Sequence, residues 1–302
     1  MRKITELSYR GRINRVTAHI EAHLAEPLTG DSLAELAALS RFHFHRMFCA
    51  MLGETPAQYV QRRRLHRAVD RLRGSQASVT AIALECGFDS AHALGKALRR
   101  STGMSATALR LAAREGAAHP FRVFRPQPAR KDRHMLQPQF KDFPSRTILV
   151  ATEFGIFDND AGAAARRAIQ RLEQFVDAHP VWRDHMRGCL AYSSRPPEGP
   201  NDPDFPFNAA FIMDAPPLLP DGSDLRLETL PGTRCAVFRH IGPYRTLWQT
   251  WQAIYRDWLP SADVKLRHQQ PWEEYMNSPH DVPPAELVTE ICVPVEGPQI
   301  QS

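Results

Sequence analysis

Carboxylates and aromatic rings near the carboxyl end of the chain could either hold a cation or move a proton. Glu273 and Tyr275 lie two residues apart in a segment, 272–276, whose pattern predicts a β-strand, so the two side chains should share a face. Glu290 falls on the last predicted strand, 287–295. Carboxylate and phenol could act as general base and acid. Alternatively, the carboxylate could pair with a cation whose flat body rests on nearby aromatic faces, for which the candidates are Tyr192, Tyr244 and Trp248.

A plainer interpretation of the same residues also stands. Trp248 and Trp251 could simply fill the core, and Glu273 could form an ion pair at its rim. Trp272 should face away from Glu273 unless the strand bends. For Glu273 we favour the pocket, and for the two tryptophans we favour core packing.

Basic, histidine and small polar residues recur in two half-alike segments about fifty residues apart, 33–59 and 82–109. Each segment predicts a short helix, a tight turn and a longer helix, with Ser40 or Ser90 as N-cap of the longer one. This unit can place one helix in the major groove of DNA. The outward sides of the two longer helices are predicted to carry Arg41, Phe42, His45 and Arg46 in the first, and Ala91, His92, Ala93, Lys96, Arg99 and Arg100 in the second.

Further helices must position these two units. Apolar residues recur at helical spacing in 8–25, and shorter helices are predicted over 32–38 and 41–51. A basic helix over 56–73 would be about 27 Å long. This length suits a connector between two DNA-reading helices, here called readers, that lie about 34 Å apart, which is one turn of the DNA duplex. Gly87 occupies a turn position that tolerates positive φ. An arginine run such as 62–64 is by itself more often a solvated face than a binding site.

Charge divides the chain into two unlike halves. Residues 1–114 hold 18 Lys and Arg against 9 Asp and Glu, whereas residues 136–302 hold 15 against 22. A basic half suits binding to the phosphate backbone of nucleic acid. Because the other half is acidic, the positive charge is confined to one part of the chain and is not spread over all of it. The contents of hydrophobic (43%) and charged (24%) residues are those of a globular protein, which argues against wholesale disorder.

Cysteine and histidine usage predicts neither a disulfide framework nor a metal centre. The five cysteines are far apart without a CxxC pair, which favours reduced thiols, and the histidines are scattered. No apolar run approaches the length of a membrane helix. We therefore expect a cytoplasmic protein without cofactor, metal or membrane association.

Residues 30–110 resemble the DNA-binding domain of the AraC/XylS family of transcription regulators. The matching residues are Leu33, Ala34, Ser40, His43, Arg46, Met47, Phe48, Gly53, Glu54, Thr55, Pro56, Tyr59, Arg64, Leu65, Ala68 and Leu72, then Ile82, Ala83, Gly87, Phe88, Ser90, Gly103, Ser105 and Arg110. The resemblance implies two recognition helices in adjacent major grooves. It places Arg41, Phe42, His45 and Arg46 of the first helix, and Ser90, Ala91, His92, Ala93, Lys96 and Arg99 of the second, at DNA.

The chain departs from that family at several positions. Ala38 stands where the family often has Gly, and Leu94, Leu98, Ala106 and Leu109 replace larger or cyclic residues. Ala91 and Ala93 have no hydrogen-bonding side chains, so they can meet only thymine methyls or leave the second helix to phosphates. We therefore expect the first helix to carry more of the sequence discrimination.

The carboxy-terminal half contains its own repeat. β-like runs at 146–151 and 234–239 are each followed by a predicted helix, 160–178 and 243–258, and then by two strand candidates. Two copies of strand–helix–strand–strand predict an α+β fold with antiparallel pairing and two helices over one face. We expect a multidomain chain, with an all-α double helix-turn-helix domain at 1–114, a proline-rich linker at 115–137 and the α+β domain at 138–302.

Residues 138–296 resemble the GyrI-like effector-binding domain. The matching pieces are Gly242-Pro243-Tyr244, Trp272-Glu273-Glu274-Tyr275 and the segment from Glu290 to Val295, and the order of the two modules resembles Rob-type regulators. Family members hold ligands, often hydrophobic cations, in a cleft between the repeats. The resemblance puts the pocket carboxylate at Glu273, with Tyr275 and Glu290 nearby.

These resemblances imply a sequence-specific transcription regulator, not an enzyme, that senses an aromatic or cationic small molecule. Its partners would be double-stranded DNA and a small-molecule effector, with RNA polymerase as a further candidate. Two alternatives stay open: a GyrI-like hydrolase using Glu273, Tyr275 and Glu290, and a protein-interaction module, each tethered to a DNA reader.

Overall fold

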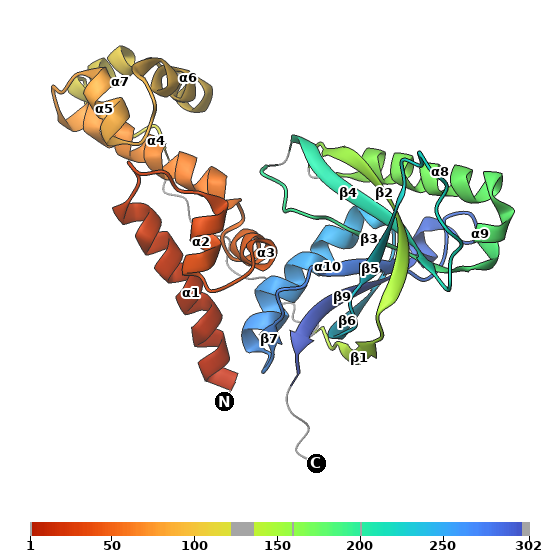
Figure 1. Cartoon of the computed structure of the whole chain (residues 1–302). Helices are drawn as coiled ribbons and strands as arrows, with labels where there is room; N and C mark the ends of the chain where they lie inside the picture. The colour runs from red at the N-terminus through yellow and green to blue at the C-terminus, as the bar shows by residue number, and fades with distance from the viewer. Residues whose placement is uncertain (1, 122–135, 159, 200, 298–302) are drawn as a thin grey trace.

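The structure, a computed structural model, describes residues 2–121, 136–158, 160–199 and 201–297. Seven helices come first and a strand-rich half follows, as Figure 1 shows. Most of the predicted linker, residues 122–135, lies outside the described residues. No helix in the described ranges has the length and apolar character needed to cross a bilayer.

The amino-terminal helices form two similar units joined by a long helix. Their bounds are α1 Arg2–Ala22, α2 Gly30–Leu36, α3 Arg41–Leu52, α4 Pro56–Gly74, α5 Val79–Glu85, α6 Ala91–Thr102 and α7 Ala106–Arg114. The hydroxyls of Ser40 and Ser90 accept hydrogen bonds from the backbone N–H groups at the starts of α3 and α6, as predicted. Helix α4 joins the two units, and each unit has its own apolar cluster.

Equivalent turns connect the two helices of each unit. Ala38 in the first turn and Gly87 in the second both have positive φ, 51° and 81°. A Cβ at Gly87 would lie 2.2 Å from the Leu24 carbonyl oxygen, which accepts a 2.8 Å hydrogen bond from Arg64 Nε. Gly87 therefore lets the second unit approach the first closely, with Arg64 of the arginine run at the junction.

The carboxy-terminal half contains a single path of antiparallel strands in the order β1-β6-β9-β8-β3-β4-β2-β5, with β7 paired to β9. The central six strands read the same from either end, because β6, β9 and β8 correspond to β2, β4 and β3. The bounds are β1 Gln139–Phe143, β2 Arg146–Ile156, β3 Met186–Tyr192, β4 Asp202–Met213, β5 Arg226–Leu230, β6 Thr233–Ile241, β7 Lys265–Leu266, β8 Trp272–Tyr275 and β9 Val288–Glu296. The predicted duplication is confirmed, and the two copies meet where β3 pairs with β8.

Two helical segments cover one face of this sheet. Helix α8 (Gly162–Ala178), followed by the short α9 (Pro180–Asp184), packs on β2 and β4. The second segment runs from η1 (Tyr244–Thr246) through α10 (Leu247–Ala253) and η2 (Ile254–Trp258) to η3 (Leu259–Ser261), and it packs on β6 and β9. A last 3₁₀ turn, η4, spans Pro284–Glu286. The opposite face has a separate apolar cluster that includes Val150, Leu190 and Trp272.

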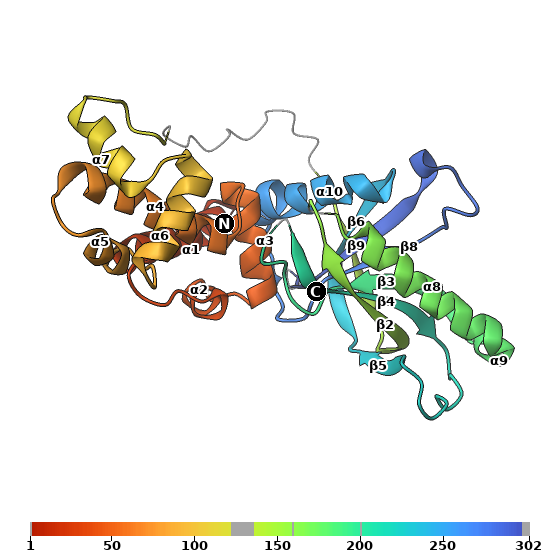
Figure 2. The same ribbon diagram turned by 90° about the horizontal axis from the view of Figure 1, so that it is seen from above.

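The two halves pack against each other through a shared apolar cluster. Side chains of α1, α2 and α3 belong to the same buried cluster as Trp251, Ile254, Tyr255 and Leu259. Helix α3 lies beside α10 in both Figure 1 and Figure 2. Tyr9 of α1 donates a hydrogen bond to the Val264 carbonyl at 3.4 Å. Helix α3 is thus part of the interface between the halves.

Candidate functional site

Helix α6 presents an open basic surface. His92, Lys96 and Arg99 are exposed, as is the cap Ser90, whereas Ala91 and Ala93 are partly covered. Within the ranges that the structure describes, none of these three charged or titratable side chains has an ion pair or hydrogen bond. The face predicted to meet DNA is therefore unobstructed on this helix.

Helix α3 differs, and here the expectation of an outward face is wrong for part of it. Arg41 is exposed, with Nε 3.5 Å from a carboxylate oxygen of Asp31. Phe42 is only 7% exposed and His43 is fully buried, while His45 and Arg46 are partly buried. The expectation failed because helical spacing shows which face of a helix is apolar and which is polar. It does not show that a segment distant in sequence covers the polar face.

His43 bridges the two halves with both ring nitrogens. Nε2 lies 2.8 Å from the Arg267 carbonyl oxygen, and Nδ1 lies 2.7 Å from the Tyr255 hydroxyl. Since a carbonyl can only accept, we assign the ring proton to Nε2, and the Tyr255 hydroxyl then donates to Nδ1. Burial lowers the His43 pKa to about 4, so the ring is neutral near pH 7.

His45 lies at a second contact with the carboxy-terminal half. Burial and then the charges of Arg46 and Arg41 lower the His45 pKa to about 4, although the Pro197 carbonyl acts in the opposite direction. Pro197 belongs to the loop between β3 and β4. This loop therefore reaches α3.

The Arg46 guanidinium contacts two aromatic rings. Its central carbon is 3.7 Å from the centroid of the Trp251 ring and 5.0 Å from that of Phe42. Burial lowers the Arg46 pKa, and the charge of Glu273 acts in the opposite direction. At any ordinary pH the side chain remains a cation.

Glu273 is the centre of an aromatic carboxylate cluster. Trp251 Nε1 donates to Glu273 Oε1 at 2.5 Å, and the Tyr275 hydroxyl donates to Oε2 at 3.2 Å. The ring centroids of Tyr275 and Tyr244 are 5.2 Å apart. Burial, and next the charge of Glu273, raises the Tyr275 pKa well above its ordinary value, so the phenol stays protonated and able to donate.

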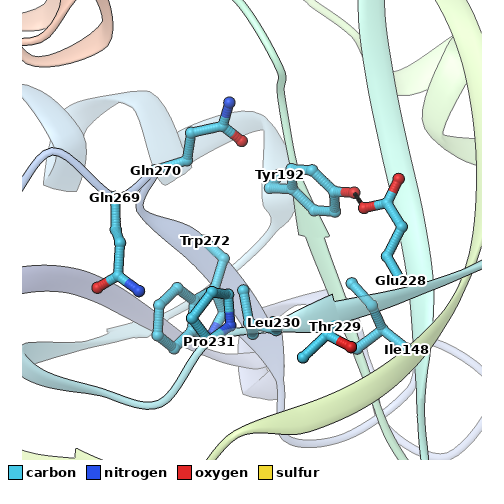
Figure 3. A pocket seen from close by; sticks show the side chains of 9 residues that line it. All are labelled: Ile148, Tyr192, Glu228, Thr229, Leu230, Pro231, Gln269, Gln270 and Trp272. Carbon is cyan, nitrogen blue, oxygen red and sulfur yellow. Dashed lines mark hydrogen bonds between the residues drawn. The ribbon is translucent and has the colours of Figure 1, made fainter.

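Two other predicted pocket residues lie on the opposite face of the sheet, which corrects the expectation that they join this cluster. Glu273 is opposite Ala191 and Ile291 in the strand register, so Tyr192 and Glu290, each one residue away, point the other way. The Tyr192 hydroxyl bonds to Glu228 (Figure 3), and Glu290 pairs with Lys141 at 2.8 Å.

A cavity of about 180 Å³ opens on that opposite face (Figure 3). Tyr192, Glu228, Gln269, Gln270 and Trp272 supply its polar and aromatic lining. It is therefore separate from the Glu273 cluster. Trp272 faces away from Glu273, as the strand alternation predicts.

The two tryptophans of α10 differ in their roles. Trp248 is 54% exposed, so the preference for core packing is wrong for this residue. Trp251 is buried, but it also bonds to Glu273, a role that we did not predict. Trp251 and Tyr255 are four residues apart and therefore share a helix face. This spacing is the sequence signal that could have indicated a shared role for the two side chains.

Comparisons with known proteins agree with this arrangement. Residues 136–296, just over half of the chain, match the GyrI-like small molecule binding domain, and residues 33–112 match a helix-turn-helix domain. The HTH-type transcriptional activator RhaS of Escherichia coli O139:H28 is 38% identical over 94 residues, which is 31% of this chain and 34% of RhaS. The chain thus spans about a third of the length of that curated relative.

Solved structures are similar to each half separately. The DNA-binding domain of AdpA, solved with a target DNA, is 36% identical, covers 34% of this chain and 94% of its own, and has a TM-score of 0.33. The EcmrR C-terminal domain is 16% identical, covers 54% and 99%, and has a TM-score of 0.43. No group of three or more His, Cys, Asp or Glu side chains suited to a metal occurs in the ranges described. Because the family model matches more than half of the chain, the chain belongs to the GyrI-like family, and its small molecule binding domain follows a helix-turn-helix domain of AraC type.

Proposed function

We propose that the chain is a DNA-binding transcription regulator whose carboxy-terminal half binds an aryl cation at Glu273. The observation that supports it best is the Glu273 carboxylate, which lies beside the Trp251 ring and accepts hydrogen bonds from Trp251 and Tyr275. A fixed negative charge next to an aromatic face is a general recognition pattern for organic cations. The guanidinium of Arg46 already lies on that face, which supports the proposal.

DNA binding is supported by a different set of residues. Helix α6 carries His92, Lys96 and Arg99 on an exposed face, while α3 has the matching cap, turn and length. Residues 1–114 carry twice as many basic as acidic residues, 18 against 9. This balance favours a phosphate backbone as partner.

The ligand assignment is tested with benzylguanidinium, which joins the guanidinium of Arg46 to an aryl ring like that of Phe42. Titration calorimetry on the full chain should show binding that Glu273→Gln weakens about tenfold, because the amide oxygen can still accept from Trp251 but the side chain has lost its charge. Glu274→Gln is the matched control, since Glu274 is the next residue, faces the other side of the sheet and pairs with Arg146 at 3.1 Å.

Equal weakening by both substitutions, or by neither, would contradict the assignment of Glu273. Steady turnover of a neutral aryl ester that Glu273→Gln abolishes would favour a hydrolase instead.

A further inference from the structure

The cation on the Trp251 face belongs to the chain itself. Arg46 reaches it from α3, so a residue of the first helix-turn-helix unit fills a position in the carboxy-terminal half. Phe42, one turn earlier on α3, also lies near the guanidinium, with its ring centroid 5.0 Å from the central carbon. The Glu273 carboxylate is held against the same tryptophan by the 2.5 Å hydrogen bond from Nε1. Aryl ring, guanidinium, indole and carboxylate thus form one assembly across the interface.

Arg46 is held there without directional bonds. Among the residues that the structure describes, it has no hydrogen-bond partner and no carboxylate oxygen within 4.0 Å. Its attraction comes from ring stacking and from the nearby negative potential of Glu273. A soluble aryl cation can offer the same two interactions, so nothing specific to an arginine side chain is needed at this position.

Helix α3 packs against the carboxy-terminal half, and we call this arrangement docked. Docking obstructs the reading of DNA by the same helix. A recognition helix contacts base edges with the residues near its N-terminus, and the side chains predicted to reach DNA from α3 are Arg41, Phe42, His45 and Arg46. Arg41 is exposed, but Phe42 is buried and His45 and Arg46 are partly buried. His43, also on α3, bonds to Tyr255 and to the Arg267 carbonyl. Helix α6, in contrast, is open. The docked chain therefore has one usable reader out of two.

We propose that Arg46 is an internal ligand of the cation site, and that an aryl cation displaces it and releases α3 to DNA. This inference rests on the function proposed above and adds its regulation. Ligand and DNA then select the same undocked state, so each raises the affinity for the other. The predicted direction is activation of DNA binding by the ligand.

The first experiment needs no ligand. Glu273→Gln removes the charge that faces Arg46, and Tyr255→Phe removes the hydrogen bond to His43 while keeping the ring. We expect each variant to bind a duplex, selected by the full-length protein from a random library, at least about fivefold more tightly than wild type. Backbone hydrogen exchange over 41–52 should rise in both variants, while exchange over 162–178 should not. Glu274→Gln should change neither quantity.

The sequence alone predicts a different result, since a pocket remote from the reader leaves DNA affinity unchanged in Glu273→Gln. Unchanged DNA affinity and unchanged exchange over 41–52 in both variants would overturn the inference. Exchange over 162–178 and the melting temperature show whether a variant has lost its fold, and the two substitutions on different side chains guard against that failure.

The second experiment adds benzylguanidinium to the wild-type protein. Release of Arg46 predicts faster exchange over 41–52 and a DNA affinity raised about fivefold or more. If benzylguanidinium binds through Glu273 but α3 stays protected, the proposed function stands and the inference fails. If it does not bind while Glu273→Gln and Tyr255→Phe release α3, the ligand class is wrong and the internal contact stands. Lower DNA affinity with bound ligand would also overturn the inference.

Discussion

At the scale of single residues, Ala38 has a strained backbone conformation, and its exposed side chain adds little packing. It has φ of 51°, it is exposed, and it occupies the turn position that Gly87 fills in the second unit. A left-handed conformation costs an L-residue roughly 1–2 kcal/mol, against roughly 0.5–1 kcal/mol for the extra freedom of glycine when unfolded. The departure from the family at Ala38 therefore has a physical cost.

We predict that Ala38→Gly stabilises the protein by about 0.5–1 kcal/mol, seen as a melting temperature higher by a few degrees. The reverse change in the second unit, Gly87→Ala, is the matched control. It should destabilise strongly, because the new Cβ would meet the Leu24 carbonyl at 2.2 Å. A lower melting temperature for Ala38→Gly would show that the alanine makes contacts that outweigh its strain.

His43 makes docking sensitive to pH. Well above pH 6.5 the ring is neutral whether α3 is docked or free, so it adds no pH dependence there. As the pH falls from 6.5 towards 4, the free ring gains a proton that the docked ring resists, because its pKa is lowered to about 4. The groups around it are the Tyr255 hydroxyl, the Arg267 and Gln269 carbonyls, the Arg46 guanidinium and the His268 ring, and none of them is an anion. His45, with a pKa also lowered to about 4, acts in the same direction.

We therefore predict that acid weakens docking, by up to about 3 kcal/mol for His43 at pH 4. Hydrogen exchange over 41–52, corrected for intrinsic rates, should accelerate between pH 7.5 and pH 5.5. Exchange over α8 serves as the internal control and should show no such change. Equal protection of 41–52 at both values would mean that His43 finds a proton acceptor in the docked state.

At the scale of elements, the sequence predicts local structure well and pairing less well. Caps such as Ser40 and Ser90, and the spacing of apolar residues, are local signals, and the helices they predict are confirmed. The face on which Tyr192 and Glu290 lie depends on the pairing of β3 with β8 and of β8 with β9. A shift of one residue in either register would reverse the faces, and no short-range pattern fixes it.

The docking of α3 could not be predicted from the sequence. Phe42, Arg46 and Trp251 come together across two hundred residues of chain, and each also fits a simpler local role. Arg46 is equally suited to a phosphate, and Trp251 to a core. Only the three-dimensional arrangement shows that the two roles are joined.

Helix α6 has an open face in the docked protein, and Lys96 is exposed on it without an ion pair in the described part of the chain. We predict that Lys96→Ala weakens binding to all duplexes about equally and reduces the slope of log affinity against log salt by about one, as loss of one phosphate contact requires. Lys265→Ala, which removes an exposed charge on β7, should leave both quantities unchanged. Loss of discrimination between duplexes without a change of slope would place Lys96 at a base instead.

At the scale of the whole molecule, the two halves carry opposite net charges and pack against each other. The acidic half, with 22 Asp and Glu against 15 Lys and Arg, covers the N-terminal part of α3 and so lowers its attraction for a polyanion. Release of α3 would remove that cover and add Arg41 and Arg46 to the phosphate contacts of α6. The number of contacts, and not only their strength, should then depend on docking.

Salt dependence measures that number directly, since each neutralised phosphate adds about 0.9 to the slope. We predict that Tyr255→Phe, which on our proposal frees α3, binds the selected duplex with a slope steeper than wild type by about one to two. Glu274→Gln should give a line parallel to wild type. Adding Lys96→Ala should reduce the slope by about one in either background, because α6 binds whether or not α3 is docked. If Tyr255→Phe gained affinity along a parallel line, its effect would come from something other than new phosphate contacts, and two readers sharing one duplex would no longer explain it.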